Sequence, residues 1–181
     1  MAHLLSGGEL DGLFDAFERS AFRLETRDRY NVPSERESLR RFLAGDPDED
    51  YARGRPWYDR TRRAAAEGRP FTRVRVVTVP LGDYSRYALW CARDNIRAGE
   101  DIRYLERSQA ARLGLPVEPP HDAWLLDDAT VVILHFDADD AFAGAEVTDD
   151  PATVARHRAW RQVAWEHALT REAFLRSLGG A

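Results

Sequence analysis

Residues 72–80, TRVRVVTVP, decide the fold. Valines alternate with Arg73 and Arg75 and the run stops at a proline, a pattern typical of a half-buried β-strand. The stretch LGDYSRYALWCARDNIRAGE that follows has helical spacing and ends near Gly99, and EDIRYLER then has the pattern of a second strand. This order predicts that strands 72–79 and 101–106 are parallel neighbours, joined by a crossover helix over 83–98.

Apolar periodicity and chain breakers predict the elements on both sides of this unit. Before it we expect a helix over 8–19, a strand beginning at Phe22, a helix capped by Ser34 and ended by Gly45, an exposed loop over 46–56 and a helix over 57–70. After it we expect a short helix over 108–115, antiparallel strands over 124–128 and 130–136 joined by a tight turn, a short strand over 144–149 and one long helix over 150–178.

The long final helix would begin with Asp150 as its cap and Pro151 as its first residue. We expect it to pack on the sheet through Val154, Trp160, Val163 and Ala164. The sequence therefore predicts one α/β domain with a mixed β-sheet flanked by helices. Within the single domain 1–181, residues 1–70 form an N-terminal segment and residues 71–181 the core.

Composition is that of a folded protein with a well-solvated surface: 181 residues, 44% of them hydrophobic and 31% charged. No run approaches the roughly 20 apolar residues of a membrane helix, and MAHLLSGGELDGLF lacks a signal-peptide pattern. A single cysteine, Cys91, excludes an internal disulfide and a cysteine-rich zinc site. We therefore expect a cytoplasmic protein without a membrane partner. All 26 basic residues are arginine, which excludes chemistry that depends on lysine.

Charge is unevenly distributed along the chain. Residues 53–75 contain eight arginines, whereas no arginine lies between Arg112 and Arg156, a stretch with ten acidic residues. The net charge of −5 argues against a general nucleic-acid binder. The arginine tract could still bind phosphate, an acidic partner, or RNA such as tRNA. Alternatively, the basic and acidic stretches neutralise each other within the fold.

Polar and aromatic residues near the expected strand ends are candidates for ligand binding: Arg23, Arg27, Tyr30, Arg75 and Asn95. Such positions commonly line clefts in α/β folds, although Arg27 and Asp28 could simply form surface salt bridges. His135 is a further candidate, facing Asp137 or Asp139 as a salt-linked pair or, alternatively, in a metal site. His157 and His167 lack the spacing of a helical metal pair. We expect neither a metal nor a cofactor.

Residues 71–167 resemble phospholipase D-like domains in their strand–helix–strand order followed by a hairpin. That hairpin in the family carries the motif HxKxxxxD, and HDAWLLDD matches it at His121 and Asp128 but has Ala123 in the lysine place. The resemblance implies a histidine nucleophile, with Asp128 orienting His121 or raising its pKa. Because the lysine is missing and the motif occurs once, where active enzymes pair two copies, we expect a degenerate, non-catalytic copy. Full activity would require a homodimer.

The whole chain resembles an actinobacterial domain-of-unknown-function family, family 6879. The motifs that carry this likeness include FERSAFRLETRDRY, RRFLAGDPDEDYARGRPWYDRTRRAAAEG, NIRAGEDIRYLERSQAARLGLP and VARHRAWRQVAWEHA. Members are often encoded beside helix-turn-helix regulators. The resemblance therefore implies a cytoplasmic regulatory or accessory role and no established chemistry.

These observations lead to one functional hypothesis and two alternatives. The chain is expected to be a non-catalytic, phospholipase D-like accessory domain that binds a protein partner, such as a helix-turn-helix regulator, or a small phosphorylated ligand. One alternative is an enzyme of actinobacterial specialised metabolism that acts on a phosphorylated or aminoacyl(-tRNA) substrate, with His121 as nucleophile or base. The other is an RNA-binding or tRNA-binding accessory protein that uses the arginine tract.

Overall fold

The predicted crossover lies at the centre of the structure, a computed structural model that describes residues 4–47 and 54–179. β2 (Phe71–Val77) and β3 (Asp101–Glu106) are parallel neighbours, and α4 (Asp83–Arg97) connects them. β1 (Ala21–Glu25) pairs in parallel with the other edge of β2. The predicted parallel pair of β2 and β3 is confirmed, and β1 runs in the same direction beside them.

Four further strands complete a mixed seven-stranded sheet in the order β6-β5-β4-β1-β2-β3-β7. They are β4 (Asp122–Leu126), β5 (Thr130–Phe136), β6 (Phe142–Thr148) and β7 (Leu169–Thr170), each antiparallel to its neighbours. The predicted tight turn joins β4 to β5, and Asp127 and Asp128 both have positive φ, of 55° and 57°. Positive φ at both central residues gives the turn a twist that matches an antiparallel hairpin.

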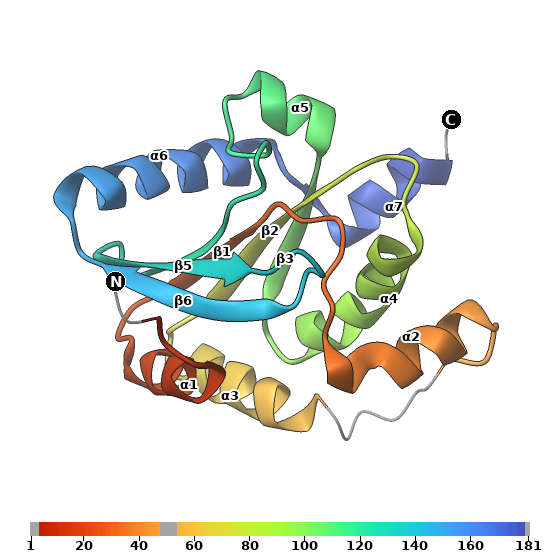
Figure 1. Cartoon of the computed structure of the whole chain (residues 1–181), viewed down its shortest axis with the longest axis horizontal. Coiled ribbons are helices and arrows are strands. Elements are labelled where there is room, and N and C mark those ends of the chain that lie inside the picture. Colours follow the sequence, from red (N-terminus) through yellow and green to blue (C-terminus); the bar gives the residue numbers. More distant parts are fainter. Residues whose placement is uncertain (1–3, 48–53, 180–181) are drawn as a thin grey trace.

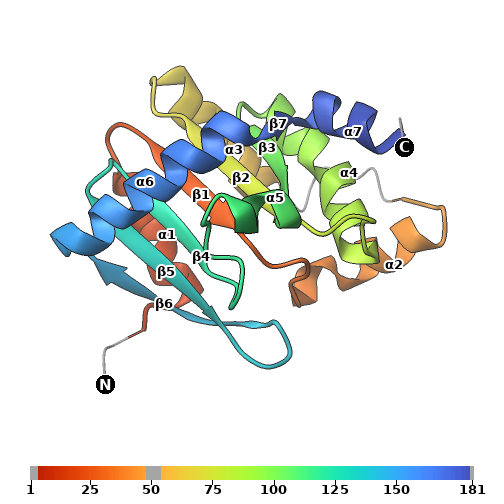
Figure 2. The same ribbon diagram turned by 90° about the horizontal axis from the view of Figure 1, so that it is seen from above.

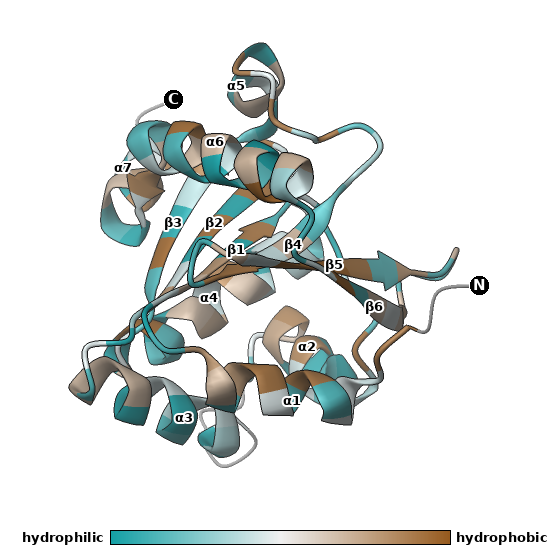
Figure 3. Ribbon diagram, turned by 90° about the vertical axis from the view of Figure 1, so that its left-hand side faces the viewer, coloured by the Kyte–Doolittle hydropathy of each residue, from teal (hydrophilic) through white to brown (hydrophobic). Residues whose placement is uncertain are grey.

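Helices cover both faces of this sheet (Figures 1 and 3). One face carries α5 (Arg107–Arg112) and α6 (Pro151–His167), and α6 lies across the strands (Figure 2). The other face carries α1 (Gly7–Ala16), α2 (Arg36–Leu43), α3 (Arg55–Ala66) and α4. The molecule is thus a three-layer α/β domain, and the two faces of its sheet have separate cores.

Alternation along the strands assigns each side chain to one of the two faces. Phe22 and Leu24 of β1 and Val74 and Val76 of β2 belong to the core beneath α6. Val154 and Ala164 are buried there, and Trp160 and Val163 pack against the same cluster, as predicted. Asp150 caps the helix by accepting a hydrogen bond from the Thr153 amide at 2.8 Å. The core on the opposite face is rich in aromatic rings from α1, α3 and β2.

The prediction of one continuous helix over 150–178 is wrong. α6 ends at His167, Ala168 is extended, and Leu169–Thr170 pairs with Arg103 and Tyr104 of β3 before α7 (Arg171–Gly179) begins. This short strand covers the backbone edge that β3 would otherwise expose. Apolar spacing is helical on both sides of the break, so periodicity could not reveal it. The Thr170 hydroxyl, which accepts from the Ala173 amide at 3.3 Å, is the local signal of a new helix start.

Two smaller expectations also need correction. Ser34 does not cap a helix but lies inside a 3₁₀ turn, η1 (Pro33–Glu35), that precedes α2. The helix expected over 57–70 already begins at Arg55, because a proline suits its first turn. Part of the exposed loop expected over 46–56, namely 48–53, lies outside the described residues.

Replacing Trp160 by alanine tests the packing of α6. Trp160 is half-buried between the sheet core and the rings of His121 and His157, so its removal should lower the free energy of unfolding by about 3 kcal/mol. Urea unfolding measures this change. Leu175→Ala is the matched control, because Leu175 is 39% exposed and should cost under ~1 kcal/mol. A loss that small for Trp160→Ala would contradict the observed packing.

Candidate functional site

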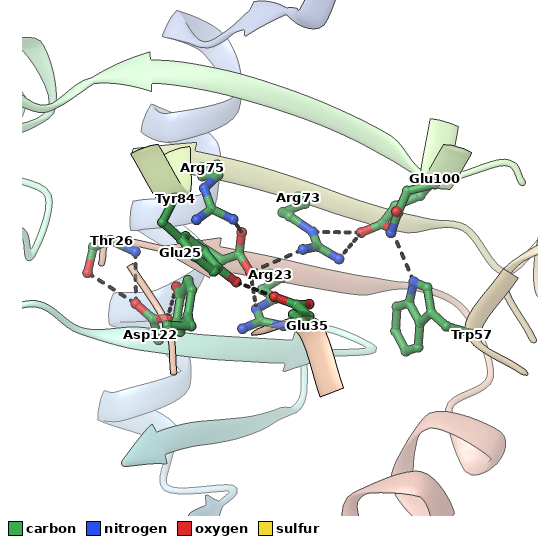
Figure 4. Close-up of polar contacts among 12 residues, drawn as sticks. Arg23, Glu25, Thr26, Glu35, Trp57, Arg73, Arg75, Tyr84, Glu100 and Asp122 are labelled. Atoms are coloured by element: carbon green, nitrogen blue, oxygen red, sulfur yellow. Dashed lines mark hydrogen bonds and ion pairs between the residues drawn. The ribbon is translucent and has the colours of Figure 1, made fainter. Parts of the chain in front are cut away.

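The face of the sheet opposite α6 carries charged side chains at its centre. Arg23 and Glu25 of β1 and Arg73 and Arg75 of β2 point to this face, because their apolar neighbours in sequence point to α6. The strand register places Arg23 beside Arg73 and Glu25 beside Arg75 (Figure 4). Two central strands of the sheet therefore bring four charges together in the interior of the domain.

Glu25 is the centre of this charged cluster. Its Oε1 lies 3.0 Å from Arg23 Nε and 3.1 Å from Arg73 Nη1, and its Oε2 lies 3.1 Å from Arg75 Nη1. Burial alone would raise the pKa of this carboxyl, but the attraction of three guanidinium groups outweighs burial and lowers the pKa to about 2. Glu25 is therefore ionised at every physiological pH.

Glu100 is a second buried carboxylate and binds the other side of Arg73. Its Oε1 lies 2.7 Å from Arg73 Nε and 2.6 Å from Nη2, while its Oε2 accepts from Trp57 Nε1 at 3.3 Å and Asn95 Nδ2 at 2.9 Å. Arg73 is thus shared between two carboxylates. Asn95, a predicted ligand-binding residue, lines the cavity at this cluster and uses its amide to orient Glu100.

Arg75 differs from Arg73 in its hydrogen bonding. Only 6% of the residue is exposed, yet its Nε and Nη2 have no hydrogen-bond partner within the described part of the chain. The guanidinium carbon lies 5.4 Å from the Tyr30 ring centroid and 5.6 Å from that of Tyr84, which holds it by cation–π attraction. Buried donors of a charged group are costly when unmatched, so this arrangement suits an acceptor that a ligand supplies.

A cavity of about 530 Å³ lies between this face of the sheet and the layer formed by α1 to α4. Arg23, Tyr30, Arg75 and Asn95 all line it, so four of the predicted ligand-binding residues come together. The Tyr84 hydroxyl donates to Glu35 Oε2 at 2.8 Å, and the Tyr30 hydroxyl donates to Asp122. The cavity therefore combines a charged floor with aromatic walls, a combination that suits binding of an organic ligand.

The other two predicted ligand-binding residues lie elsewhere. Arg27 Nη1 lies 2.6 Å from Asp140 Oδ1 and belongs to a shallow surface depression outside the cavity. His135 faces neither Asp137 nor Asp139; its Nε2 lies 3.7 Å from Glu146 Oε2 on the neighbouring strand β6. Among the residues that the structure describes, no three histidine, cysteine or acidic side chains form a group that could hold a metal ion.

His121 and Asp128 do not form a pair. His121 precedes β4 and faces α6, with its Nε2 2.9 Å from His157 Nε2, whereas Asp128 lies beyond the other end of β4, 2.5 Å from Arg161 Nη1. Burial, reinforced by the nearby His157, lowers the pKa of His121 to about 4. The expectation that Asp128 orients His121 or raises its pKa is therefore wrong. His121 also lies across the sheet from the cavity.

Both aspartates of the hairpin turn connect distant parts of the fold. The Asp127 carboxylate accepts the backbone amides of Glu18, Arg19 and Ser20 at 2.7–3.0 Å, and these hydrogen bonds outweigh burial and lower its pKa. Asp128 fixes the same turn to α6 through Arg161. The second half of HDAWLLDD is thus an anchor for the chain rather than part of a catalytic pair.

The arginine tract is largely neutralised within the fold. Arg60 pairs with Asp11 and Asp15, Arg62 with Asp59, Arg69 with Glu67, and Arg73 with two buried glutamates. These partners come from residues 11–100 and not from the acidic stretch after Arg112. The arginines of the tract are therefore largely neutralised within the fold, as the alternative proposed. Their partners, however, are not the acidic residues after Arg112 that this alternative named.

Sequence reasoning missed Glu25, Arg73, Tyr84 and Tyr104 as cavity residues. The available signal was the pair of arginines in TRVRVV, because charges at alternate positions of a central strand must face either solvent or a buried counter-charge. Their counter-charge, Glu25, lies about fifty residues earlier in the chain, and only the strand register reveals it.

A family model described as "Domain of unknown function (DUF6879)" matches residues 8–176. The chain belongs to this family. The DUF6879 match includes β1 to β4 and α4, so the charged cluster and the aromatic walls lie within the matched region. A search of curated proteins found no match to the chain. Within residues 4–47 and 54–179, no helix has both the length and the apolar character needed to cross a membrane.

Two methionine substitutions in this DUF6879 domain should differ in their effect on stability. Arg73→Met leaves two buried carboxylates short of a counter-charge and should lower the free energy of unfolding by about 3–5 kcal/mol. Arg75→Met removes a half-matched charge while Arg23 and Arg73 still neutralise Glu25, so stability should change by less than ~1 kcal/mol. Urea unfolding at pH 7 measures both. Equal losses for the two variants would show that Arg75 is as structural as Arg73.

Proposed function

We propose that this chain is a non-catalytic accessory domain that binds a small organic anion in the cavity beneath α1 to α4. The observation that carries the proposal is Arg75, a buried guanidinium whose Nε and Nη2 have no acceptor among the described residues. A protein gains nothing in stability from a buried charge that is only half matched. An anion bound at Arg75 would give both donors a partner.

The charge balance of the cluster supports an anionic ligand. Arg23, Arg73 and Arg75 contact Glu25, and Arg73 also contacts Glu100, so these five groups comprise three positive and two negative charges. Asp122, at the edge of this cluster, already accepts hydrogen bonds from Tyr30 and from the Thr26 amide, and burial raises its pKa. A bound anion would neutralise the positive charge that the contacts to Glu25 and Glu100 leave.

The position of His121 supports binding rather than catalysis. The enzyme alternative depends on this histidine as nucleophile or base, but it faces α6, and the sheet separates it from the cavity. A low pKa would weaken the histidine as a base, since a group with a pKa of about 4 holds a proton poorly at pH 7. We therefore propose a phospholipase D-like architecture without phosphodiesterase chemistry.

An accessory role requires that occupancy of the cavity be communicated to a partner. The likeness to a family often encoded beside helix-turn-helix regulators makes such a regulator the candidate partner, in the cytoplasm. The walls of the cavity include residues of α3, of α4 and of the sheet. A bound ligand would therefore contact these two helices and the sheet at the same time. Ordering of these helices is the change that a partner could detect.

A ligand screen tests the proposal. The wild-type protein is titrated by calorimetry with a panel of small carboxylates, phosphate esters and neutral analogues of each, and every hit is repeated with Arg75→Met. We expect saturable binding of at least one anion, with a loss of about 100-fold or more in Arg75→Met because two charge-assisted hydrogen bonds disappear.

Arg161→Met is the matched control for this screen. Arg161 lies on α6, across the sheet from the cavity, so its removal should leave the affinity unchanged. Absence of saturable binding by every anion, or equal affinity of wild type and Arg75→Met, would refute the proposed function.

A further inference from the structure

We infer that the ligand is a planar aromatic monocarboxylate, held by its carboxylate at Arg75 and by its ring between the aromatic walls of the cavity. This inference rests on the proposed function and names the chemical class of the ligand. Three features carry it: the edge of the guanidinium that is free, the net charge of the cluster, and the composition of the walls.

The two free donors of Arg75 lie on one edge of its guanidinium. Nη1 binds Glu25 at 3.1 Å, whereas Nε and Nη2, which point in the same direction, have no partner in the described ranges. A pair of parallel N–H groups matches the two oxygens of a carboxylate in a bidentate contact. The geometry therefore selects a planar, two-oxygen acceptor group.

Tyr104 provides a third donor at the same place. The strand register places Tyr104 of β3 directly beside Arg75 of β2, and its hydroxyl is buried without a hydrogen-bond partner among the residues described. Its ring stacks on Phe174, with centroids 5.1 Å apart, which fixes the ring orientation. The pKa of this hydroxyl is raised to about 12, chiefly by burial, so it remains a donor. Arg75 and Tyr104, on neighbouring strands, thus provide three donors without partners among the described residues, and we place the anionic group of the ligand beside them.

The charges around the cavity favour a ligand with one negative charge over one with two. Three guanidiniums contact Glu25 and Glu100, which leaves one positive charge among these five groups. Glu35 lines the cavity and Asp122 contacts Tyr30, so a phosphate dianion would meet more repulsion from these carboxylates than a monoanion. A monocarboxylate satisfies the same donors without the second charge.

The walls of the cavity select an aromatic body for the ligand. Tyr30 and Tyr84 cover Arg75, and Trp57, Trp124 and Phe136 extend the aromatic lining away from it. Tyr30 already packs against Phe136 with centroids 5.3 Å apart, so rings are held in place around the space. A cavity of about 530 Å³ is larger than acetate needs and falls in the range of drug-sized ligand pockets. A flat ring would gain stacking contacts with these walls.

Calorimetric titration with matched probes tests this inference. The probes are indole-3-carboxylate and 2-naphthoate, the neutral indole-3-carboxamide, acetate and phenyl phosphate. We expect an aromatic carboxylate to bind at one site, with indole-3-carboxamide and acetate each at least ~30-fold weaker. Arg75→Met should lose at least ~100-fold in affinity and Tyr104→Phe about 5- to 10-fold, while Arg161→Met stays unchanged. The urea unfolding curve of each variant shows that it is folded.

The outcomes separate this inference from the proposed function. Binding of phenyl phosphate through Arg75, without binding of either aromatic carboxylate, would overturn the inference and leave the proposed function standing. Equal affinity for indole-3-carboxylate and its carboxamide would also overturn it, because the anionic group would then contribute nothing. If none of these anions binds, the inference fails, and the broader panel of carboxylates and phosphate esters decides whether the proposed function fails with it.

Discussion

The contact between Glu25 and three guanidinium groups is the interaction on which the interior of this domain depends. Two central strands can carry arginines at alternate positions only because one buried carboxylate lies within 3.1 Å of all three. Removal of these charges from water is expensive, and apolar residues of similar size would often be at least as stable. The net contribution of this cluster to stability is therefore small, and we propose that it serves ligand binding. Arg75 distinguishes a role in stability from a role in binding, because two of its donor nitrogens have no partner among the described residues.

The two faces of the sheet differ in character: the face beneath α6 is apolar, and the opposite face carries the charged cluster. Side chains alternate along a strand. The two strands that place arginines at the cavity, β1 and β2, therefore place Phe22, Val74 and Val76 in the core beneath α6. The paired histidines His121 and His157 lie on this second face, packed against Trp160. Apolar packing supports the strands on this face, and the strand register assembles the charged cluster on the other.

Local patterns were sufficient to predict the crossover and the hairpin. The alternation in TRVRVVTVP, the end of α4 near Gly99 and the two aspartates of the β4–β5 turn are all short-range signals. The break at Ala168 and the cluster around Glu25 depend instead on pairing between distant segments, which periodicity does not report. The match of HDAWLLDD to the HxKxxxxD motif wrongly suggested that His121 and Asp128 form a pair. Along an extended strand, seven residues separate them by roughly 20 Å. Arg23, Tyr30, Arg75 and Asn95 line one cavity, but Arg23 and Arg75 lie within β1 and β2 and not at the strand ends where they were expected.

The central claim is that the free edge of Arg75 is a binding group. The most direct measurement is the NMR signal of arginine Nε–H groups during titration with an aromatic carboxylate, with Arg75→Met used to assign the Arg75 resonance. The account predicts that the Arg75 Nε–H shifts in a saturable manner and that its exchange with solvent slows, while the signal of Arg73, already bound to Glu100, changes little. An Arg75 signal that stays unchanged at saturating ligand would contradict the account.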